Sequence, residues 1–177
     1  MRPAFAVAIC LLLATALAQT SGGRMPFQLT STAFQHENEI PAKYTCKGAD
    51  VSPALAWSGL PAGTKSVALV VDDPDAPAGT WVHWVAYNIP PGVTQFHEGM
   101  PKDAQLKDGT RQGKNDFGKL GYNGPCPPPG APHRYFFHVY ALNTTLELKP
   151  GASRKELDSA IAGKVLSQTE LMGTFRR

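Results

Sequence analysis

The stretch from Val70 to Pro90, VVDDPDAPAGTWVHWVAYNIP, contains two apolar runs separated by an acidic, proline-rich turn. The first run belongs to Ser66–Asp72, SVALVVD, whose continuous apolar character predicts a strand buried on both faces. Acidic residues form strands poorly and are costly to bury without partners, so the sequence DDPD needs an explanation other than packing. We interpret this interruption as the floor of a small polar pocket.

The second run, Trp81–Ile89, predicts another buried strand. The period-two geometry of an extended chain assigns its residues alternately to two faces, one with Trp81, His83, Val85 and Tyr87 and the other with Val82, Trp84 and Ala86. Both faces are largely apolar, so the strand should lie deep in the fold.

Further extended segments are predicted along the chain, at Phe27–Thr30, Ala54–Trp57, His133–Leu142, Thr144–Leu148 and the C-terminal SQTELMGTFRR. The last of these reads as a final strand or an extended tail. Alternation in HRYFFHVYAL places His133, Tyr135, Phe137 and Val139 on one face.

One helix is predicted near the C-terminus. Ser153 is a suitable N-cap, and Glu156 three residues later completes a capping box. Leu157, Ile161 and Val165 follow at four-residue steps and predict the apolar stripe of this helix.

The segment from Pro90 to Pro132 holds most of the remaining glycine and proline and has no clear periodicity. Its aromatic residues, Phe96, Phe117 and Tyr122, indicate an ordered surface loop. The chain contains 17 Gly and 16 Pro, which favours many turns and a β-rich fold over a helical one.

The N-terminal residues predict export. Arg2, the apolar run Ala4–Leu17 and the small residues at 16–18 are typical of a signal peptide over residues 1–18, with an uncleaved anchor as the alternative. A flexible leader over 19–25 and a single domain over 26–177 would follow. The net charge of +3, without a basic cluster among aromatics, does not indicate nucleic-acid binding.

Two cysteines, Cys46 and Cys126, remain after removal of the signal peptide. In an oxidising compartment we expect them to form a disulfide, which would close a loop of about 80 residues and contribute at most roughly 4 to 5 kcal/mol. The alternative is two separate buried thiols.

Five ionisable or hydroxyl side chains lie beside rigid turns or at strand ends. The prolines in DPDAP restrict the backbone around the two carboxylates, while the histidines and the tyrosine fall on predicted strands. A pocket at these strand ends would collect Asp73, Asp75, His83, His133 and Tyr135. Taken singly, each has an ordinary structural role as a turn aspartate, a core histidine or a packing tyrosine.

Four motifs in this order resemble the phosphatidylethanolamine-binding protein family, in its compact bacterial and archaeal branch that is often labelled Raf kinase inhibitor-like. They are CKGADVSPALAW from Cys46, DPDAP from Asp73, WVHW from Trp81 and GYNGPCPPPGAPHRY from Gly121. The resemblance covers nearly all of the chain after the expected signal peptide.

This resemblance implies a mainly β fold of two packed antiparallel sheets with Greek-key connections and one or two peripheral helices. It also implies an anion-binding pocket, which we expect to bind phosphate-type groups of small molecules or phospholipid headgroups. No serine or cysteine is visibly paired with a base and there is no close-spaced histidine motif, so we expect a non-enzymatic protein without a cofactor or a metal. The implied lining is Asp73, Asp75, His83, His133 and Tyr135, with the backbone of Gly124 and Pro125 as a further wall and Trp81 as a weaker candidate. We expect a periplasmic or secreted location.

Two departures from the family stand out. No counterpart of the C-terminal helix of animal members follows Thr174, and cytosolic relatives lack an export signal, so kinase regulation is not expected to carry over. One alternative is a secreted inhibitor of a protease or kinase that acts through the pocket rim and the proline-rich loop. Another is an enzyme in which two histidines and two aspartates hold a metal or act as acid and base.

Two carboxylates repel a phosphate most strongly where water is excluded. We hypothesise that His83 and His133 are both charged and thereby offset Asp73 and Asp75 before the ligand arrives.

Overall fold

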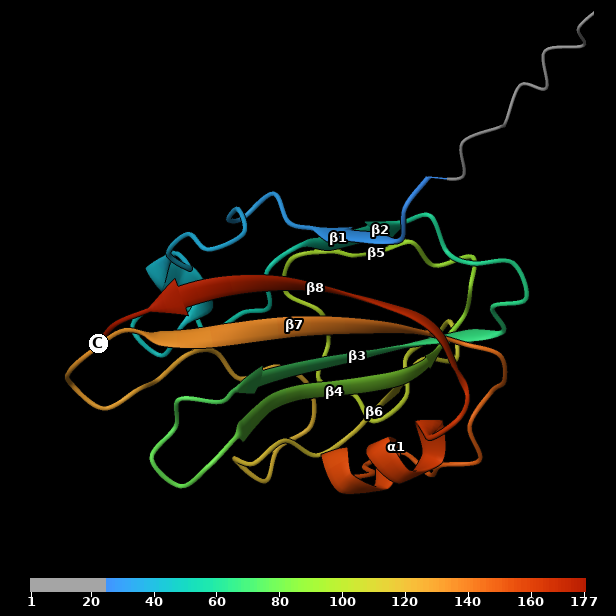
Figure 1. Ribbon diagram of the computed structural model, residues 1–177. Coiled ribbons are helices and arrows are strands. Elements are labelled where there is room, and N and C mark those ends of the chain that lie inside the picture. The colour runs from blue at the N-terminus through green and yellow to red at the C-terminus, as the bar shows by residue number, and fades with distance from the viewer. Residues whose placement is uncertain (1–24) are drawn as a thin grey trace, which may run out of the picture.

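The computed structural model describes residues 25–177, so the expected signal peptide and all but the last residue of the expected leader lie outside the described residues. Two antiparallel sheets pack face to face, and one α-helix covers the outer face of the larger sheet (Figure 1). The mainly β fold predicted from the sequence is confirmed. Over residues 25–177, no helix has the length and apolar character needed to cross a membrane.

The larger sheet has the strand order β6-β4-β3-β7-β8, formed by β6 (Arg111–Gln112), β4 (Trp81–Ile89), β3 (Ser66–Asp73), β7 (His133–Leu142) and β8 (Val165–Phe175). The smaller sheet has the order β1-β2-β5, formed by β1 (Gln28–Thr30), β2 (Leu55–Ser58) and β5 (Gln95–Phe96). The helical segments are the 3₁₀ turn η1 (Ala42–Tyr44) and the helix α1 (Arg154–Ile161). The chain passes between the sheets after β2, after β4 and after β5.

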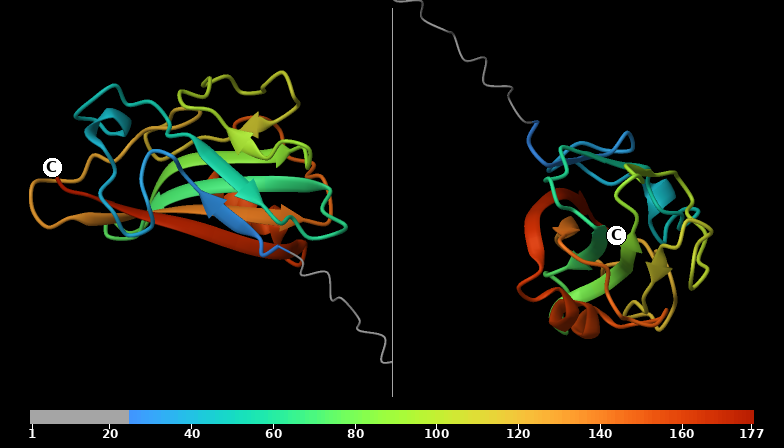
Figure 2. Two further views of the ribbon diagram at one scale, coloured as in Figure 1. Left: turned by 90° about the horizontal axis from the view of Figure 1, so that it is seen from above. Right: turned by 90° about the vertical axis from the view of Figure 1, so that its right-hand side faces the viewer.

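The centre of the larger sheet is β3, which pairs with β4 on one side and β7 on the other. All eight of its residues are buried, as its continuous apolar run predicts. Leu69 and Val71 pack into the core between the two sheets, and Ala68 and Val70 pack into a second core beneath α1. In the end-on view, α1 lies on the side of the larger sheet opposite the smaller one (Figure 2).

A β-bulge changes the predicted faces of β4. Val71 pairs with Trp84 and Asp72 pairs with Val82, so His83 is an extra residue opposite β3. His83 therefore contacts Tyr135, which belongs to the same core as Trp84, while Val82 and Val85 both belong to the other core. The strict alternation that grouped His83 with Val85 is wrong here, because the bulge turns the His83 side chain to the other face of the sheet.

The helix α1 begins as predicted but ends earlier. Ser153 caps it with the capping box to Glu156, and Leu157 and Ile161 are buried. Gly163 then adopts a φ of +72°, a conformation that favours glycine, and the chain leaves the helix. Val165, expected in the apolar stripe, instead begins β8.

The segment Thr144–Leu148, expected to pair as a strand, runs as a loop. The Asn88 side chain holds it, because its Nδ2 donates to the Leu146 carbonyl at 2.8 Å and its Oδ1 accepts from the Leu146 N–H at 2.7 Å. A side chain thus replaces the strand pairing that the sequence suggested.

A disulfide joins Cys46 to Cys126, with 5.4 Å between their Cα atoms. It ties the segment after η1 to the loop that leads into β7. The Cys46 N–H also donates to the Pro125 carbonyl at 3.1 Å, so the two segments are joined by a main-chain bond as well as by the covalent link.

Removal of this disulfide should destabilise the fold. We expect the double variant Cys46→Ser, Cys126→Ser to lose about 2–4 kcal/mol of the free energy of unfolding, because a loop spanning 80 residues is freed in the unfolded chain. Urea denaturation at neutral pH measures the difference. Wild-type protein under reducing conditions should match the variant, and an unchanged midpoint in both would contradict the prediction.

Candidate functional site

A cavity of about 270 Å³ opens at the end of the larger sheet where β3 ends and β4 and β7 begin. Three of its lining side chains carry titratable groups: Asp73 from β3, His83 from β4 and His133 from β7. The remaining lining residues are mostly apolar and are Ala76, Pro77, Ala78, Trp81, Phe117, Cys126, Pro127 and Pro128. The strand ends therefore place a few polar groups inside an apolar wall.

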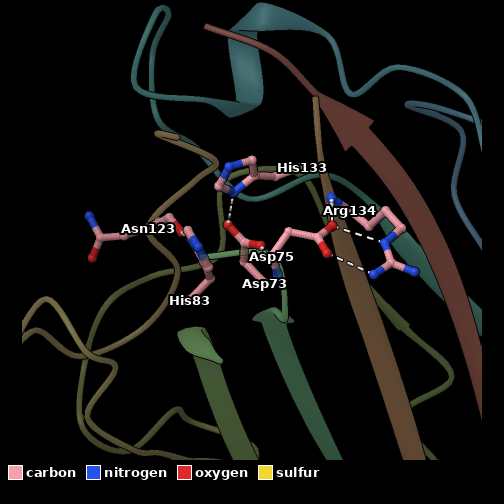
Figure 3. Close-up of polar contacts among 6 residues, drawn as sticks. All are labelled: Asp73, Asp75, His83, Asn123, His133 and Arg134. Carbon is pink, nitrogen blue, oxygen red and sulfur yellow. Dashed lines mark hydrogen bonds and ion pairs between the residues drawn. The ribbon is translucent and has the colours of Figure 1, made fainter. Parts of the chain in front are cut away.

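Asp73 orients His133. The Nδ1 of His133 lies 2.8 Å from Oδ2 of Asp73, and the side chains are only 11% and 5% exposed (Figure 3). Asp73 Oδ1 accepts the Asp75 N–H at 2.8 Å, which holds the carboxylate in the turn. Because the carboxylate accepts from Nδ1, the other ring nitrogen, Nε2, is the one available to a ligand.

His83 is held differently. Its Nδ1 lies 2.7 Å from the Asn123 main-chain oxygen, which can only accept a hydrogen bond (Figure 3). Burial lowers the pKa of His83 below its usual value, although the Asn123 carbonyl and the charge of Asp73 oppose this shift. His83 is therefore neutral at neutral pH, which corrects the hypothesis that both histidines are charged.

Asp75 lies beside the cavity but is engaged elsewhere. Its carboxylate accepts from Arg134 Nε at 2.9 Å, from Arg134 Nη2 at 2.7 Å and from the Arg134 N–H at 2.9 Å (Figure 3). This guanidinium lowers the pKa of Asp75 to about 2, despite the opposing effect of partial burial. Asp75 is thus an ion-paired residue of the turn, and it is not among the residues that line the cavity.

Tyr135 contacts His83 but does not line the cavity. Its side chain is fully buried and its ring meets the His83 ring edge-on at 5.3 Å. Burial, followed by the charge of Asp73, raises the pKa of Tyr135 above its usual value. Its hydroxyl has no hydrogen-bond partner among the described residues. The sequence placed Tyr135 on the lining, whereas the structure places it behind His83.

Gly124 and Pro125 anchor the wall without lining it. A Cβ at Gly124 would lie 2.1 Å from the Tyr44 carbonyl oxygen, so only glycine allows this close approach. The Gly124 N–H donates to Asp50 Oδ1 at 2.6 Å. Gly124 and Pro125 hold the loop in place, and Pro127 and Pro128, which follow them in the chain, form the wall of the cavity.

Several supporting residues were missed from the sequence. Phe117 packs 5.3 Å from the His83 ring and 5.5 Å from the Trp81 ring, so it closes one side of the cavity. Asn115 Nδ2 donates to the Gly121 carbonyl and to Asn123 Oδ1, which fixes the loop that holds His83. The sequence signals were weak, because asparagine in a glycine-rich loop is ordinarily a turn former.

Asp50 was also missed. Its carboxylate accepts from Asn123 Nδ2 at 3.1 Å as well as from the Gly124 N–H, and its backbone adopts a φ of +52°. It therefore positions Asn123, which in turn positions His83. Asp50 lies in the family motif CKGADVSPALAW, but the motif by itself does not indicate a link to a strand more than thirty residues away.

Among residues 25–177, no lysine or arginine lines the cavity. Within residues 25–177, no group of three histidine, cysteine or acidic side chains is arranged to hold a metal ion. The polar chemistry of the cavity consequently rests on one carboxylate and two imidazoles.

A small cavity with apolar walls and a few oriented polar groups, built on the ends of rigid strands, is typical of a protein that binds small ligands. The family model described as phosphatidylethanolamine-binding protein matches residues 30–176. The chain belongs to this family, and the resemblance inferred from its motifs is confirmed.

Relatives and solved structures support the same family membership. The chain is 51% identical to a UPF0098 protein of Methanothermobacter thermautotrophicus over 84% of its own length and 98% of the relative. It is 48% identical to one of Pyrococcus horikoshii over 100% of its length and 91% of the relative. Two crystal structures each cover 85% of the chain. One is a putative phosphatidylethanolamine-binding protein homologue of Chlamydia trachomatis, which is 41% identical, has a TM-score of 0.78 and is covered over 97% of its own length. The other is E. coli YbcL, described as a new member of the mammalian PEBP family, which is 35% identical, has a TM-score of 0.80 and is covered over 98% of its own length.

The neutral state of His83 can be measured. We expect its imidazole to titrate with a midpoint below 6.5 in a proton NMR titration, because burial penalises the charged ring. Since the unfolded chain takes up this proton more readily than the native state, His83 should make the native state less stable as the pH falls below 6.5.

The signal is assigned by its absence in His83→Asn. In that variant the free energy of unfolding should fall less steeply between about pH 6.5 and about pH 5 than in the wild type. A midpoint at or above 6.5 for His83 would show that the ring is charged at mildly acidic pH, contrary to this description.

Proposed function

We propose that this chain is a binding protein whose cavity accepts the phosphate-type group of a small molecule or of a phospholipid headgroup. The observation that carries the proposal is the buried Asp73–His133 pair in a cavity whose walls are mostly apolar. Burying a carboxylate is costly unless it is paired, and here it holds an imidazole with one nitrogen left for a ligand.

The charges favour an anion once His133 carries a proton. A protonated His133 neutralises Asp73 and presents Nε2–H as a charge-assisted donor to an oxyanion. A neutral His133 leaves the Asp73 charge uncompensated, and the cavity then repels an anion. Anion affinity is therefore expected to fall when His133 loses this proton.

The size and the walls of the cavity favour a small ligand. A volume of about 270 Å³ is below the range of roughly 300–1,000 Å³ typical of sites for drug-sized ligands. The rings of Trp81 and Phe117, packed edge to face at 5.5 Å, offer an apolar surface to the group that carries the phosphate. A headgroup-sized phosphate ester fits both features.

The disulfide supports the proposal of a periplasmic or secreted location. Disulfides such as Cys46–Cys126 persist in oxidising compartments and are rare where thiols are kept reduced. A ligand in that compartment is either a free phosphate ester or the headgroup of a lipid at the membrane surface.

Phosphorylethanolamine is the probe that tests this function. Calorimetric titration at about pH 5.5 should show binding that weakens at least about tenfold at about pH 8, as expected if a protonated His133 is the donor. The variant His133→Asn should abolish most of the binding at pH 5.5.

The matched control is His138→Asn. His138 lies on the same strand, but on the opposite face, where it contacts Asp72 and Glu170. This variant should bind as the wild type does, with circular dichroism confirming that both variants are folded. Equal affinity at the two pH values, or equal loss in the two variants, would refute the proposed site.

A further inference from the structure

We propose that the cavity selects oxyanions that carry a hydrogen of their own, so that it binds phosphate monoesters in their singly protonated form in preference to diesters and sulfates. The specificity-determining atom is Nε2 of His83, which accepts a hydrogen bond from the P–OH of the ligand. This inference rests on the proposed function and names the chemical class of its ligand.

The Asn123 carbonyl decides the state of His83. Nδ1 of His83 lies 2.7 Å from this oxygen, and an oxygen that only accepts requires the hydrogen to be on Nδ1. A neutral imidazole carries one N–H, so Nε2 then has a lone pair and can only accept. The loop enforces this tautomer, because Asp50 holds Asn123 through its side chain at 3.1 Å.

The surroundings of His83 keep the ring neutral. Its side chain is buried, and the rings of Tyr135 and Phe117 each meet it edge-on at 5.3 Å. The charged groups that act on it are Asp73 from β3 and Asp50 from the loop after η1, and both favour the charged ring. Burial outweighs them and lowers the pKa of His83.

The remaining polar groups of the cavity leave one donor position. Ionised Asp73 only accepts, and it already accepts from His133 Nδ1 and from the Asp75 N–H. The Tyr135 hydroxyl is buried, and Tyr135 is not among the residues that line the cavity. The donor from the lining side chains is therefore Nε2–H of protonated His133, while His83, which also lines the cavity, has Nε2 left as an acceptor.

An oxyanion that has no hydrogen brings one of its lone pairs toward the lone pair of His83 Nε2, and the two lone pairs repel each other. A phosphate monoester in its singly charged form has two oxygens that share the negative charge and can accept from His133, and one P–OH that can donate to His83. A sulfate ester or a phosphate diester of the same charge has no such hydrogen. A site built to accept a ligand hydroxyl strongly rejects the analogue that lacks it, because its buried acceptor is left unpaired.

Methyl phosphate and methyl sulfate form the matched pair of probes. They share the methyl group and, near pH 6, methyl phosphate is about half in the singly charged form whereas methyl sulfate has the same charge without the hydrogen. We expect wild-type protein to bind methyl phosphate at least about tenfold more tightly than methyl sulfate at pH 6 in an NMR or calorimetric titration. Dimethyl phosphate, which represents the diester linkage of an intact phospholipid, should bind as weakly as methyl sulfate.

Two variants separate the roles of the histidines. In His83→Asn, the amide reaches the position of Nδ1 and keeps the bond to Asn123, but the acceptor at Nε2 is lost. The ratio of the methyl phosphate and methyl sulfate affinities should fall toward one. In His133→Asn, the bond to Asp73 is kept and the donor is lost, so both ligands should weaken while their ratio remains.

The outcomes are distinguishable without any variant. If methyl phosphate and methyl sulfate both bind wild-type protein with equal affinity, the inference is overturned and the phosphate-type site stands. If neither binds, the proposed function fails with it. If dimethyl phosphate alone binds tightly, the ligand is a diester such as a lipid headgroup, and the selection for monoesters is wrong.

Discussion

The position of β3 between β4 and β7 is the constraint on which the cavity depends. Antiparallel pairing on both sides brings the end of β3 beside the start of β4 and the start of β7. Asp73, His83 and His133 leave the sheet at this common edge, although they come from segments up to 60 residues apart. A rigid, fully buried strand thus sets the spacing of the three polar groups before any ligand is present.

The end of β3 carries two adjacent carboxylates, Asp72 and Asp73, which have different roles. Successive residues of a strand point to opposite faces, so Asp73 meets His133 while Asp72 points toward α1. Asp72 accepts from Arg154 Nη1 at 2.6 Å and lies 3.5 Å from His138 Nε2. Although burial opposes the shift, these two partners lower the pKa of Asp72. One carboxylate joins the helix to the sheet, and the other serves the cavity.

The two histidines of the cavity have different environments. A histidine beside a carboxylate gains from carrying a proton, whereas a histidine beside a carbonyl in an apolar setting does not. His133 and His83 have these two environments and face one space. In the proposed site His133 donates once it is protonated and His83 accepts, which is the basis for expecting a ligand that both accepts and donates.

The strands Trp81–Ile89 and His133–Leu142 were predicted with their observed bounds, because long apolar or alternating segments leave little choice of structure. The capping box of α1 was equally clear from Ser153 and Glu156, whereas the helix end was missed because Gly163 acts through a single backbone angle. The family itself followed from four ordered motifs, and the family model confirms it.

The sequence alone therefore determined the long central strands, the start of the helix, the family and most of the polar residues near the cavity, since these depend on local composition and spacing. Tertiary structure decided which of those residues face the cavity. The bulge at His83 turned it toward Tyr135, Arg134 neutralised Asp75, and Asn123 set the tautomer of His83. Each of these outcomes depends on a contact between segments distant in the chain, and no local pattern encodes such a contact.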